Sequence, residues 1–130
     1  MDPAQRILGT WRLVRSSHID ERGDTQYPYG PDAIGYIYYS EAHIVAVQIS
    51  RRARRVPVDL AALQHDYLAY FGRYEIDAAR GVVRHLIEGE ALLGNHAREE
   101  ERLYRFTDDD LLYLVPNDGS RREILWQRVR

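Results

Sequence analysis

The chain has 130 residues, a formal charge of −2 and no cysteine. This length predicts one domain, residues 1–130, large enough to bury roughly two-thirds of its unfolded surface. The balanced charge gives no global field for nucleic acid or an anionic membrane, and the lack of cysteine excludes disulfides, thiolate nucleophiles and cysteine metal sites.

All 18 basic residues are arginine, which excludes Schiff-base chemistry through a lysine amine. Residues 1–6 show no basic region followed by an apolar core, and no apolar run approaches the ~18 residues of a membrane span. We therefore expect a cytoplasmic protein without a nucleic-acid or membrane partner.

The chain is predicted to begin with a short helical turn and a strand. Residues 3–8 form the turn, because Pro3 presets the first helical position. The pattern then alternates with a period of two, so that Trp11, Leu13 and Arg15 share one face of the first strand. Residues 20–32 are rich in proline and glycine and are expected to be a loop without strand pairing.

Residues 33–40 and 43–50 predict a hairpin with Glu41 and Ala42 at its tip. Both strands are apolar on both faces, so the pattern leaves open which face points inward. A strand that is apolar on both sides needs a cover for its outer face, either a helix or a partner subunit. A homodimer is therefore one predicted assembly.

One substantial helix is predicted between the third and fourth strands. Asp59 suits the N-cap, an apolar stripe runs through Phe71, and Gly72 ends the helix. The arginine-rich run before it, residues 51–55, is expected to be a solvated loop, and Pro57 ends the extended segment.

The second half of the chain predicts a meander of hairpins joined by polar and glycine-containing turns. The remaining strands are expected at residues 73–77, 82–90, 98–107, 111–116 and 121–129, with a loop around Gly94, Asn95 and His96. Together the segments predict an all-β chain of about eight strands. The expected fold is a closed antiparallel up-and-down barrel, which is wide enough to hold one small ligand.

An ordered set of segments spans almost the whole chain. It consists of Gly9-Thr10-Trp11-Arg12-Leu13-Val14, Tyr27-Pro28-Tyr29-Gly30-Pro31, Gly35-Tyr36-Ile37-Tyr38-Tyr39, Tyr70-Phe71-Gly72-Arg73-Tyr74, His85 with Glu88-Gly89, and Trp126 with Arg128. The set resembles the bacterial lipocalin-like domain family of the calycin superfamily. The resemblance implies an eight-stranded lipocalin-like barrel in which Arg128 stacks on Trp11 near the closed end by a cation–π contact. Relatives in the superfamily include passive binders and small cyclases or isomerases, so fold alone does not select the function.

Three residues are predicted to carry chemistry. His85 shares a strand face with Val83 and Ile87, so its imidazole is expected inside the barrel as a general acid or base. Tyr74 is expected near it, and phenol and imidazole together can bind a carbonyl or enol oxygen. Arg15 brings a guanidinium into the barrel if its strand face is internal. The alternatives are a structurally satisfied histidine, a core tyrosine and an Arg15 turned outward by a bulge.

The chain has 10 tyrosines but only 2 phenylalanines, which predicts an apolar wall rich in hydroxyl donors. Such a wall suits a hydrophobic ligand that carries oxygen functions. The predicted ligand-binding residues are Tyr39, Gln48, Tyr70, Tyr104 and Trp126.

No metal or cofactor is expected. The histidines lack metal-ligand spacing, no serine lies on a nucleophile elbow, and there is no glycine-rich phosphate loop. Three functions remain: a passive binding protein for a hydrophobic oxygenated metabolite, a cofactor-independent cyclase or isomerase of a biosynthetic pathway, and a dimeric interaction module with a packed interior. Titratable groups inside a small cavity favour the enzyme.

Overall fold

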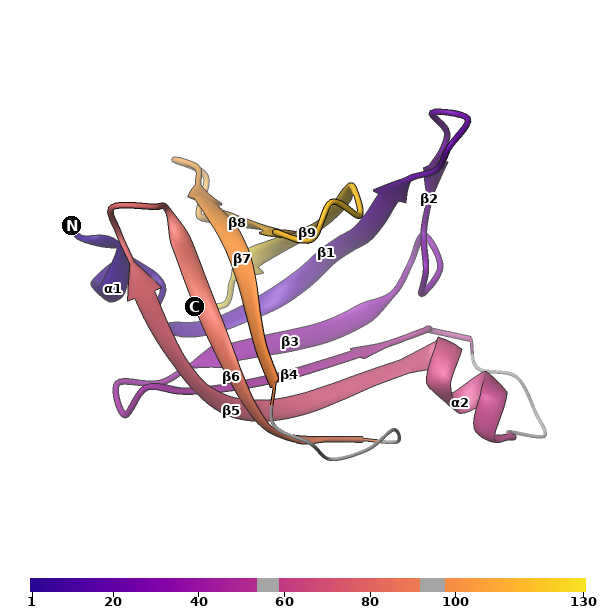
Figure 1. The fold of residues 1–130 in the computed structure, drawn as a ribbon, viewed down its shortest axis with the longest axis horizontal. Helices are drawn as coiled ribbons and strands as arrows, with labels where there is room; N and C mark the ends of the chain where they lie inside the picture. The colour runs from indigo at the N-terminus through magenta and orange to yellow at the C-terminus, as the bar shows by residue number, and fades with distance from the viewer. Residues whose placement is uncertain (54–58, 92–97) are drawn as a thin grey trace.

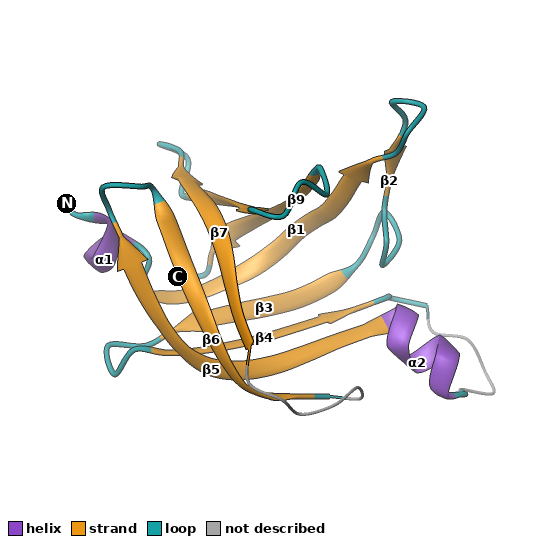
Figure 2. Cartoon of the chain, in the orientation of Figure 1, coloured by secondary structure: helices purple, strands orange, loops and turns teal. Residues whose placement is uncertain are grey.

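The computed structural model describes residues 1–53, 59–91 and 98–130, and strands dominate it (Figure 1, Figure 2). The elements in chain order are α1 (Pro3–Arg6), β1 (Gly9–Ile19), β2 (Thr25–Gln26), β3 (Ile34–Tyr39), β4 (Ile44–Ser50), α2 (Leu60–Asp66), β5 (Tyr67–Asp77), β6 (Val82–Glu90), β7 (Arg98–Phe106), β8 (Leu111–Pro116) and β9 (Arg122–Arg128). Within these ranges, neither helix is long and apolar enough to cross a lipid bilayer.

The strands form one antiparallel sheet that closes on itself. Neighbouring strands follow the order β1-β3-β4-β5-β6-β7-β8-β9, and β9 pairs back with β1 from Trp11 opposite Arg128 to His18 opposite Arg122. The short strand β2 adds to β1 outside this ring. The predicted eight-stranded up-and-down barrel is therefore confirmed.

Side-chain alternation fixes the faces that the sequence left open. In β3, Ile37 and Tyr39 are buried, whereas Tyr36 and Tyr38 are exposed. The register between β3 and β4 places Ile37 opposite Val47, which is also buried. These three side chains belong to the apolar core of the barrel.

Helix α1 closes one end of the barrel, opposite the end that carries α2 (Figure 1). The indole Nε1 of Trp11 donates to the carbonyl of Ile7 at 2.9 Å. The Arg128 guanidinium lies 4.2 Å from the centroid of the Trp11 ring and donates to the carbonyl of Leu8 at 2.8 Å. The predicted cation–π contact is confirmed, and it ties the last strand to the first.

Helix α2 is shorter than predicted. Its N-cap is Asp59, as expected, with the carboxylate accepting a backbone N–H of the first turn at 2.7 Å. The helix ends at Asp66 and the chain continues as β5, where Tyr70 lies opposite Val47 of β4. Pairing with strands on both sides of β5 outweighs the helical pattern of this segment. The prediction of a helix through Phe71 was therefore wrong.

A short pairing also occurs where a loop was predicted. Thr25 and Gln26 pair with Ile19 and His18. The carboxylate of Asp20 supports the connecting turn by accepting two of its backbone N–H groups at 2.9 Å. The side-chain bonds of this turn bring the chain back beside β1, so the expectation of no pairing was wrong for these two residues.

The arginine-rich run is partly described, and its first member is not simply solvated. Arg51 donates through Nε to Asp66 at 3.0 Å, and Asp66 is buried. This ion pair ties the end of β4 to the end of α2. Several residues of the sequence predictions lie outside the described ranges: Arg54, Arg55, Pro57, Gly94, Asn95 and His96.

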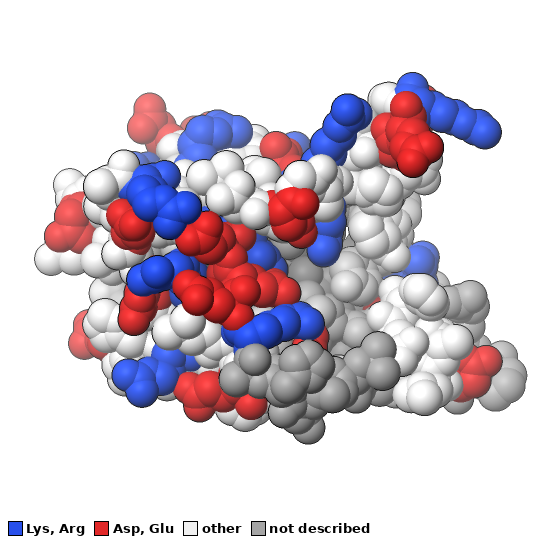
Figure 3. Space-filling view, in the orientation of Figure 1, with Lys and Arg blue, Asp and Glu red and all other residues white. Residues whose placement is uncertain are grey.

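The outer face of β5, β6 and β7 carries interleaved acidic and basic side chains (Figure 3). Arg84 contacts Glu75 at 2.5 Å and Glu99 at 3.5 Å, while Arg80 contacts Glu101 at 2.9 Å. Exposed pairs of this kind contribute about 0–1 kcal/mol each. They mark a face that favours contact with water.

Candidate functional site

His85 lies inside the barrel, in the middle of β6. Val83 and Ile87 flank it on the same face, and all three side chains are buried. Arg84 and Leu86 alternate with them and lie on the other face. The imidazole is therefore in the interior, as the alternation predicted.

Two tyrosine hydroxyls hold the His85 ring between them. The Tyr39 hydroxyl is 2.6 Å from Nε2, and the Tyr70 hydroxyl is 2.7 Å from Nδ1. Tyr39 comes from β3 and Tyr70 from β5, so this hydrogen-bonded chain links strands that are distant in sequence. The sequence predicted Tyr74 as the phenol beside His85, whereas the structure brings Tyr39 and Tyr70 to the ring.

Burial keeps the side chains of Tyr39, His85 and Tyr70 neutral near pH 7. Burial, reinforced by the positive charge of Arg102, lowers the pKa of the His85 imidazole to about 3. Burial raises the pKa of the Tyr70 hydroxyl to about 12 and that of Tyr39 well above its ordinary value. The site therefore contains a neutral imidazole between two neutral phenols.

The hydrogen bonds decide which nitrogen of His85 carries the proton. Tyr39 is fully buried, and His85 is the sole hydrogen-bond partner of its hydroxyl among the described residues. If Tyr39 did not donate to Nε2, its O–H would stay unpaired at a cost of about 1–3 kcal/mol. We therefore assign the proton to Nδ1, which donates to the Tyr70 oxygen. Tyr70 lines the cavity and Tyr39 does not, so the O–H of Tyr70 can donate to water or a ligand there without the penalty that an unpaired Tyr39 would carry.

His85 and Tyr70 line a cavity of about 120 Å³. Ile49 and Leu68 belong to its apolar wall and lie opposite each other near α2, so the cavity faces the end of the barrel away from α1. Pockets for drug-sized ligands measure roughly 300–1,000 Å³, whereas an apolar cavity of about 150 Å³ holds benzene. The cavity is therefore suited to a body about the size of one ring.

The four charged residues of the cavity lining were not predicted from the sequence: Arg98, Glu100, Arg102 and Arg122. Glu100 lies opposite His85 and Arg102 opposite Val83 in the pairing of β7 with β6, and both line the cavity. The positive charge of Arg102 also acts on the Tyr70 hydroxyl and opposes the rise of its pKa. Strand β7 is so rich in charge that it suggests a solvated face. Side chains of β7 alternate between its two faces, and the pairing of Glu100 with His85 shows that Glu100 and Arg102 are on the inward face.

Trp126, which the sequence predicts as a ligand-binding residue, lies in the cavity lining. Its side chain is buried, and its indole N–H has no hydrogen-bond partner in the part of the chain that the structure describes. An unpaired buried donor is unfavourable by about 1–3 kcal/mol, so an acceptor that enters the cavity can gain this energy.

Tyr74 and Tyr104 belong to the opposite, closed end of the interior. Tyr74 lies opposite His85 in the pairing of β5 with β6, but its hydroxyl donates to the carbonyl of Ser40 at 2.8 Å. The Tyr104 ring packs 5.5 Å from the ring of Phe106. The cavity lining includes neither tyrosine.

Arg15 and Gln48 lie on the outer face and not at the cavity, where they were predicted; for Arg15 the stated alternative holds, a bulge that turns the side chain outward. A β-bulge between Leu13 and Arg15 shifts the register against β9, and Arg15 then pairs with Glu123 at 3.6 Å. Gln48 alternates with the buried side chains of β4 and accepts a hydrogen bond from the Tyr67 hydroxyl. The bulge and the β4 parity keep both side chains away from the cavity.

The closed eight-stranded antiparallel barrel with a small internal cavity is an architecture that can hold a small ligand. Residues 8–129 match the model of a family described as the lipocalin-like domain, and the chain belongs to this family. No curated protein matches the chain. Membership of the family supports the binding of a small molecule.

Proposed function

We propose that the barrel binds a compact hydrophobic molecule that places an acceptor oxygen on the Tyr70 hydroxyl. One observation carries the proposal. Tyr39 donates to His85 and His85 donates to the Tyr70 oxygen, so the O–H of Tyr70 is available at the wall of the cavity. A carbonyl oxygen is a suitable partner, since it accepts a hydrogen bond and brings no donor of its own. The small cavity volume supports a ligand of about one ring.

The test compares a ketone with a hydrocarbon of similar shape. Wild type and Tyr70→Phe are titrated with acetophenone and with toluene, and binding is followed by tryptophan fluorescence. Loss of one hydrogen bond should weaken acetophenone binding by about 10-fold in Tyr70→Phe and leave toluene binding unchanged.

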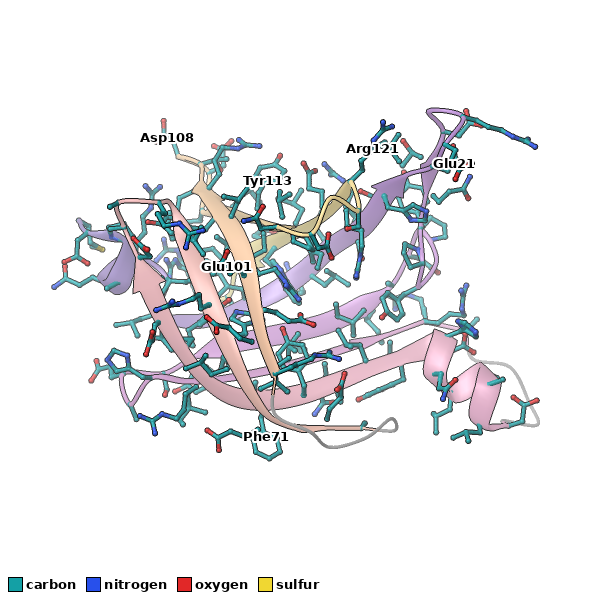
Figure 4. All side chains as sticks on the ribbon, in the orientation of Figure 1. Glu21, Phe71, Glu101, Asp108, Tyr113 and Arg121 are labelled. Atoms are coloured by element: carbon teal, nitrogen blue, oxygen red, sulfur yellow. The ribbon has the colours of Figure 1, made fainter. Side chains whose placement is uncertain are left out.

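The matched control for this titration is Tyr113→Phe. The Tyr113 ring lies 4.0 Å from the Arg105 guanidinium, and its side chain alternates with the cavity-lining Leu114, on the outer face of β8 (Figure 4). The control should bind both probes as wild type does. An equal acetophenone affinity in wild type and Tyr70→Phe would contradict the assigned donor.

We further propose that the protein converts its ligand, as a cofactor-independent isomerase or cyclase. Glu100 would take a proton from the carbon next to a substrate carbonyl and return it to another carbon, while the electron pair rests on the oxygen as an enolate. The Tyr70 O–H and Arg102 would stabilise that enolate oxygen. A pKa of about 3 and two engaged nitrogens support a positioning role for His85, in place of the general base predicted from the sequence.

Hydrogen–deuterium exchange tests this chemistry without knowledge of the natural substrate. Acetophenone is incubated in D₂O with the protein, and loss of its methyl proton signal is followed by NMR. Wild type should accelerate the exchange over buffer, and both Tyr70→Phe and Glu100→Gln should reduce the protein-dependent rate by at least about 10-fold. Tyr74→Phe, at the closed end, should keep the wild-type rate. Binding without accelerated exchange would identify a passive binder.

A second candidate function is self-association through the outer face of β3, β4 and β5. This face exposes a group of large apolar side chains: Ile34, Tyr36, Tyr38, Ile44 and Phe71. Phe71 points away from the barrel in Figure 4, and a groove of about 900 Å³ runs over the same strands. Aromatic side chains present roughly 150–250 Å² each when fully exposed, so the half-exposed group offers on the order of 400 Å². A stable dimer needs about 800 Å² per partner, which this group and its polar rim can supply to a second copy.

The oligomeric state tests the dimer directly. Sedimentation equilibrium should give a dimer for the wild-type chain of 15.2 kDa, and Phe71→Arg should shift it to a monomer. The matched control Leu103→Arg changes an exposed apolar residue of β7, away from the groove, and should stay dimeric. A monomeric wild type up to about 100 μM would contradict this candidate function.

A further inference from the structure

The cavity presents mostly hydrogen-bond donors, because the carboxylate in its lining already binds two arginines. Glu100 is the acidic residue of the lining, against the three arginines Arg98, Arg102 and Arg122. Its Oε1 forms an ion pair with the Nε of Arg98 at 3.0 Å, and its Oε2 accepts from Arg102. Both oxygens of the carboxylate are therefore engaged by the protein itself.

Arg122 differs from the other two arginines of the cavity. It lies on β9, two and four residues before Ile124 and Trp126, and shares their inward face. Its guanidinium forms no ion pair or hydrogen bond within residues 1–53, 59–91 and 98–130. Its charged and polar neighbours are Asp118 and the hydroxyl of Tyr29, which interact with it electrostatically. A positive charge is thus left at the cavity without a direct counter-ion.

Two neutral donors complete this surface. The Tyr70 O–H is directed away from His85 by the tautomer assigned above. The indole N–H of Trp126 is buried without an acceptor in the described part of the chain, whereas the indole N–H of Trp11 donates to the Ile7 carbonyl. A ligand that satisfies both donors must offer hydrogen-bond acceptors.

We infer that the ligand is a compact organic carboxylate: an apolar body of about one ring with its carboxylate toward Tyr70, Trp126 and Arg122. This inference rests on the proposed binding function and names its ligand class. A carboxylate accepts hydrogen bonds at both oxygens and supplies the charge that balances a guanidinium. An alcohol would supply no negative charge to balance the guanidinium, and an amine would add a positive charge beside the arginines.

The probes are single-ring compounds that differ only in their head group: benzoate, benzyl alcohol and toluene. The readout is the pair of indole N–H signals in a ¹⁵N NMR spectrum, in which Trp126→Phe identifies the signal of Trp126. Benzoate should shift the Trp126 signal and leave that of Trp11 unchanged. It should also bind at least about 10-fold more tightly than either neutral probe, which corresponds to about 1.4 kcal/mol.

The variant Arg122→Gln removes the unpaired charge from the cavity. Benzoate affinity should fall by about 10-fold, and toluene affinity should stay within about twofold of wild type. The matched control Arg12→Gln removes an exposed arginine from the outer face of β1 and should leave both affinities unchanged.

The outcomes separate this inference from the proposed function. If toluene or benzyl alcohol shifts the Trp126 signal and benzoate binds no better, the carboxylate is wrong and the binding cavity stands. The same conclusion follows if Arg122→Gln and Arg12→Gln weaken benzoate equally. If none of the three probes shifts the Trp126 signal, both the ligand class and the proposed binding function are wrong.

Discussion

The barrel contains two pairs of a tryptophan and an arginine, and the two pairs differ in whether the protein supplies their hydrogen-bond partners. At the α1 end, the Trp11 indole donates to Ile7, and Arg128 lies over its ring and donates to a backbone carbonyl. Around the cavity, which opens at the other end, the Trp126 indole has no acceptor among the described residues, and Arg122 has no ion pair there either. The first end has its polar groups satisfied by the protein, whereas the second leaves donors for a ligand.

This difference shows how one barrel separates stability from binding. Hydrogen bonds made within the protein stabilise the fold, while unpaired donors in the cavity lower the stability and raise the affinity for an acceptor. His85 lies between the two regions, linked to the closed half through Tyr39 and to the cavity through Tyr70. The following predictions test whether the two ends behave as differently as their contacts indicate.

The largest expected effect comes from Trp11→Ala at the closed end. It removes a buried aromatic ring, its hydrogen bond to Ile7 and its contact with Arg128. The free energy of unfolding should fall by about 3–5 kcal/mol, measured by urea denaturation. A loss below about 1.5 kcal/mol would show that Trp11 is not the anchor of this end.

The next largest effect is expected when Arg128 and Arg122 are each replaced by methionine and the losses of stability are compared. Arg128→Met loses the cation–π contact and the bonds to the Leu8 and Arg6 carbonyls, so we expect a loss of about 2–3 kcal/mol. Arg122→Met removes a guanidinium without a direct partner in the described part, and stability should change by less than about 0.5 kcal/mol. Urea denaturation of both variants gives the comparison. Equal losses would contradict the assignment of different roles.

The pH dependence of stability tests the buried imidazole between the two ends. The pKa of His85 is lowered to about 3 in the folded chain, so between about pH 6.5 and pH 3 the unfolded chain binds a proton that the folded chain does not. Stability from this group is present above pH 6.5 and is lost as the pH falls, by about 1.4 kcal/mol per unit.

The measurement is the unfolding free energy of wild type and His85→Gln between pH 7.5 and about 4.5. Carboxylates titrate in both proteins, so the difference between the two slopes isolates His85. The control His65→Gln removes an exposed histidine of α2 and should keep the wild-type slope. Parallel curves for wild type and His85→Gln would rule out a buried neutral imidazole.

The smallest expected effect is the difference in stability between variants that remove one or the other indole N–H. Trp11→Phe breaks a buried hydrogen bond and leaves the Ile7 carbonyl without its indole donor, whereas Trp126→Phe removes a donor that has no acceptor in the described residues. Both changes shorten a buried aromatic side chain to a similar extent. Trp11→Phe should therefore cost about 1 kcal/mol more than Trp126→Phe in urea denaturation. The reverse order would contradict the proposed division between the two ends.

The alternation of the sequence predicted much of the barrel because strand periodicity is a local property. The inward face of Val83, His85 and Ile87 follows from period two alone, and so does the contact of Trp11 with Arg128 once the family pattern is recognised. The same reasoning did not predict the end of α2 at Asp66, because strand pairing overrode a helical pattern.

The partners of the candidate site could not be read in the same way. Alternation places a side chain inside or outside, but only the closed register brings Tyr39 and Tyr70 to the two nitrogens of one ring. The many charges of β7 suggested a solvated strand, and only the pairing with β6 shows that Glu100 and Arg102 face inward. One bulge was enough to turn Arg15 outward, since a shift of one residue exchanges the faces of a strand.

The sequence by itself determined the architecture of this protein, the inward imidazole of His85 and the anchored tryptophan of the closed end. Only the tertiary structure decided which tyrosines hold the imidazole, which arginines reach the cavity and which indole stays unpaired. The physical reason is the range of the interactions: a strand records its own two faces in its residues, whereas hydrogen bonds across a barrel depend on the register of strands far apart in the chain.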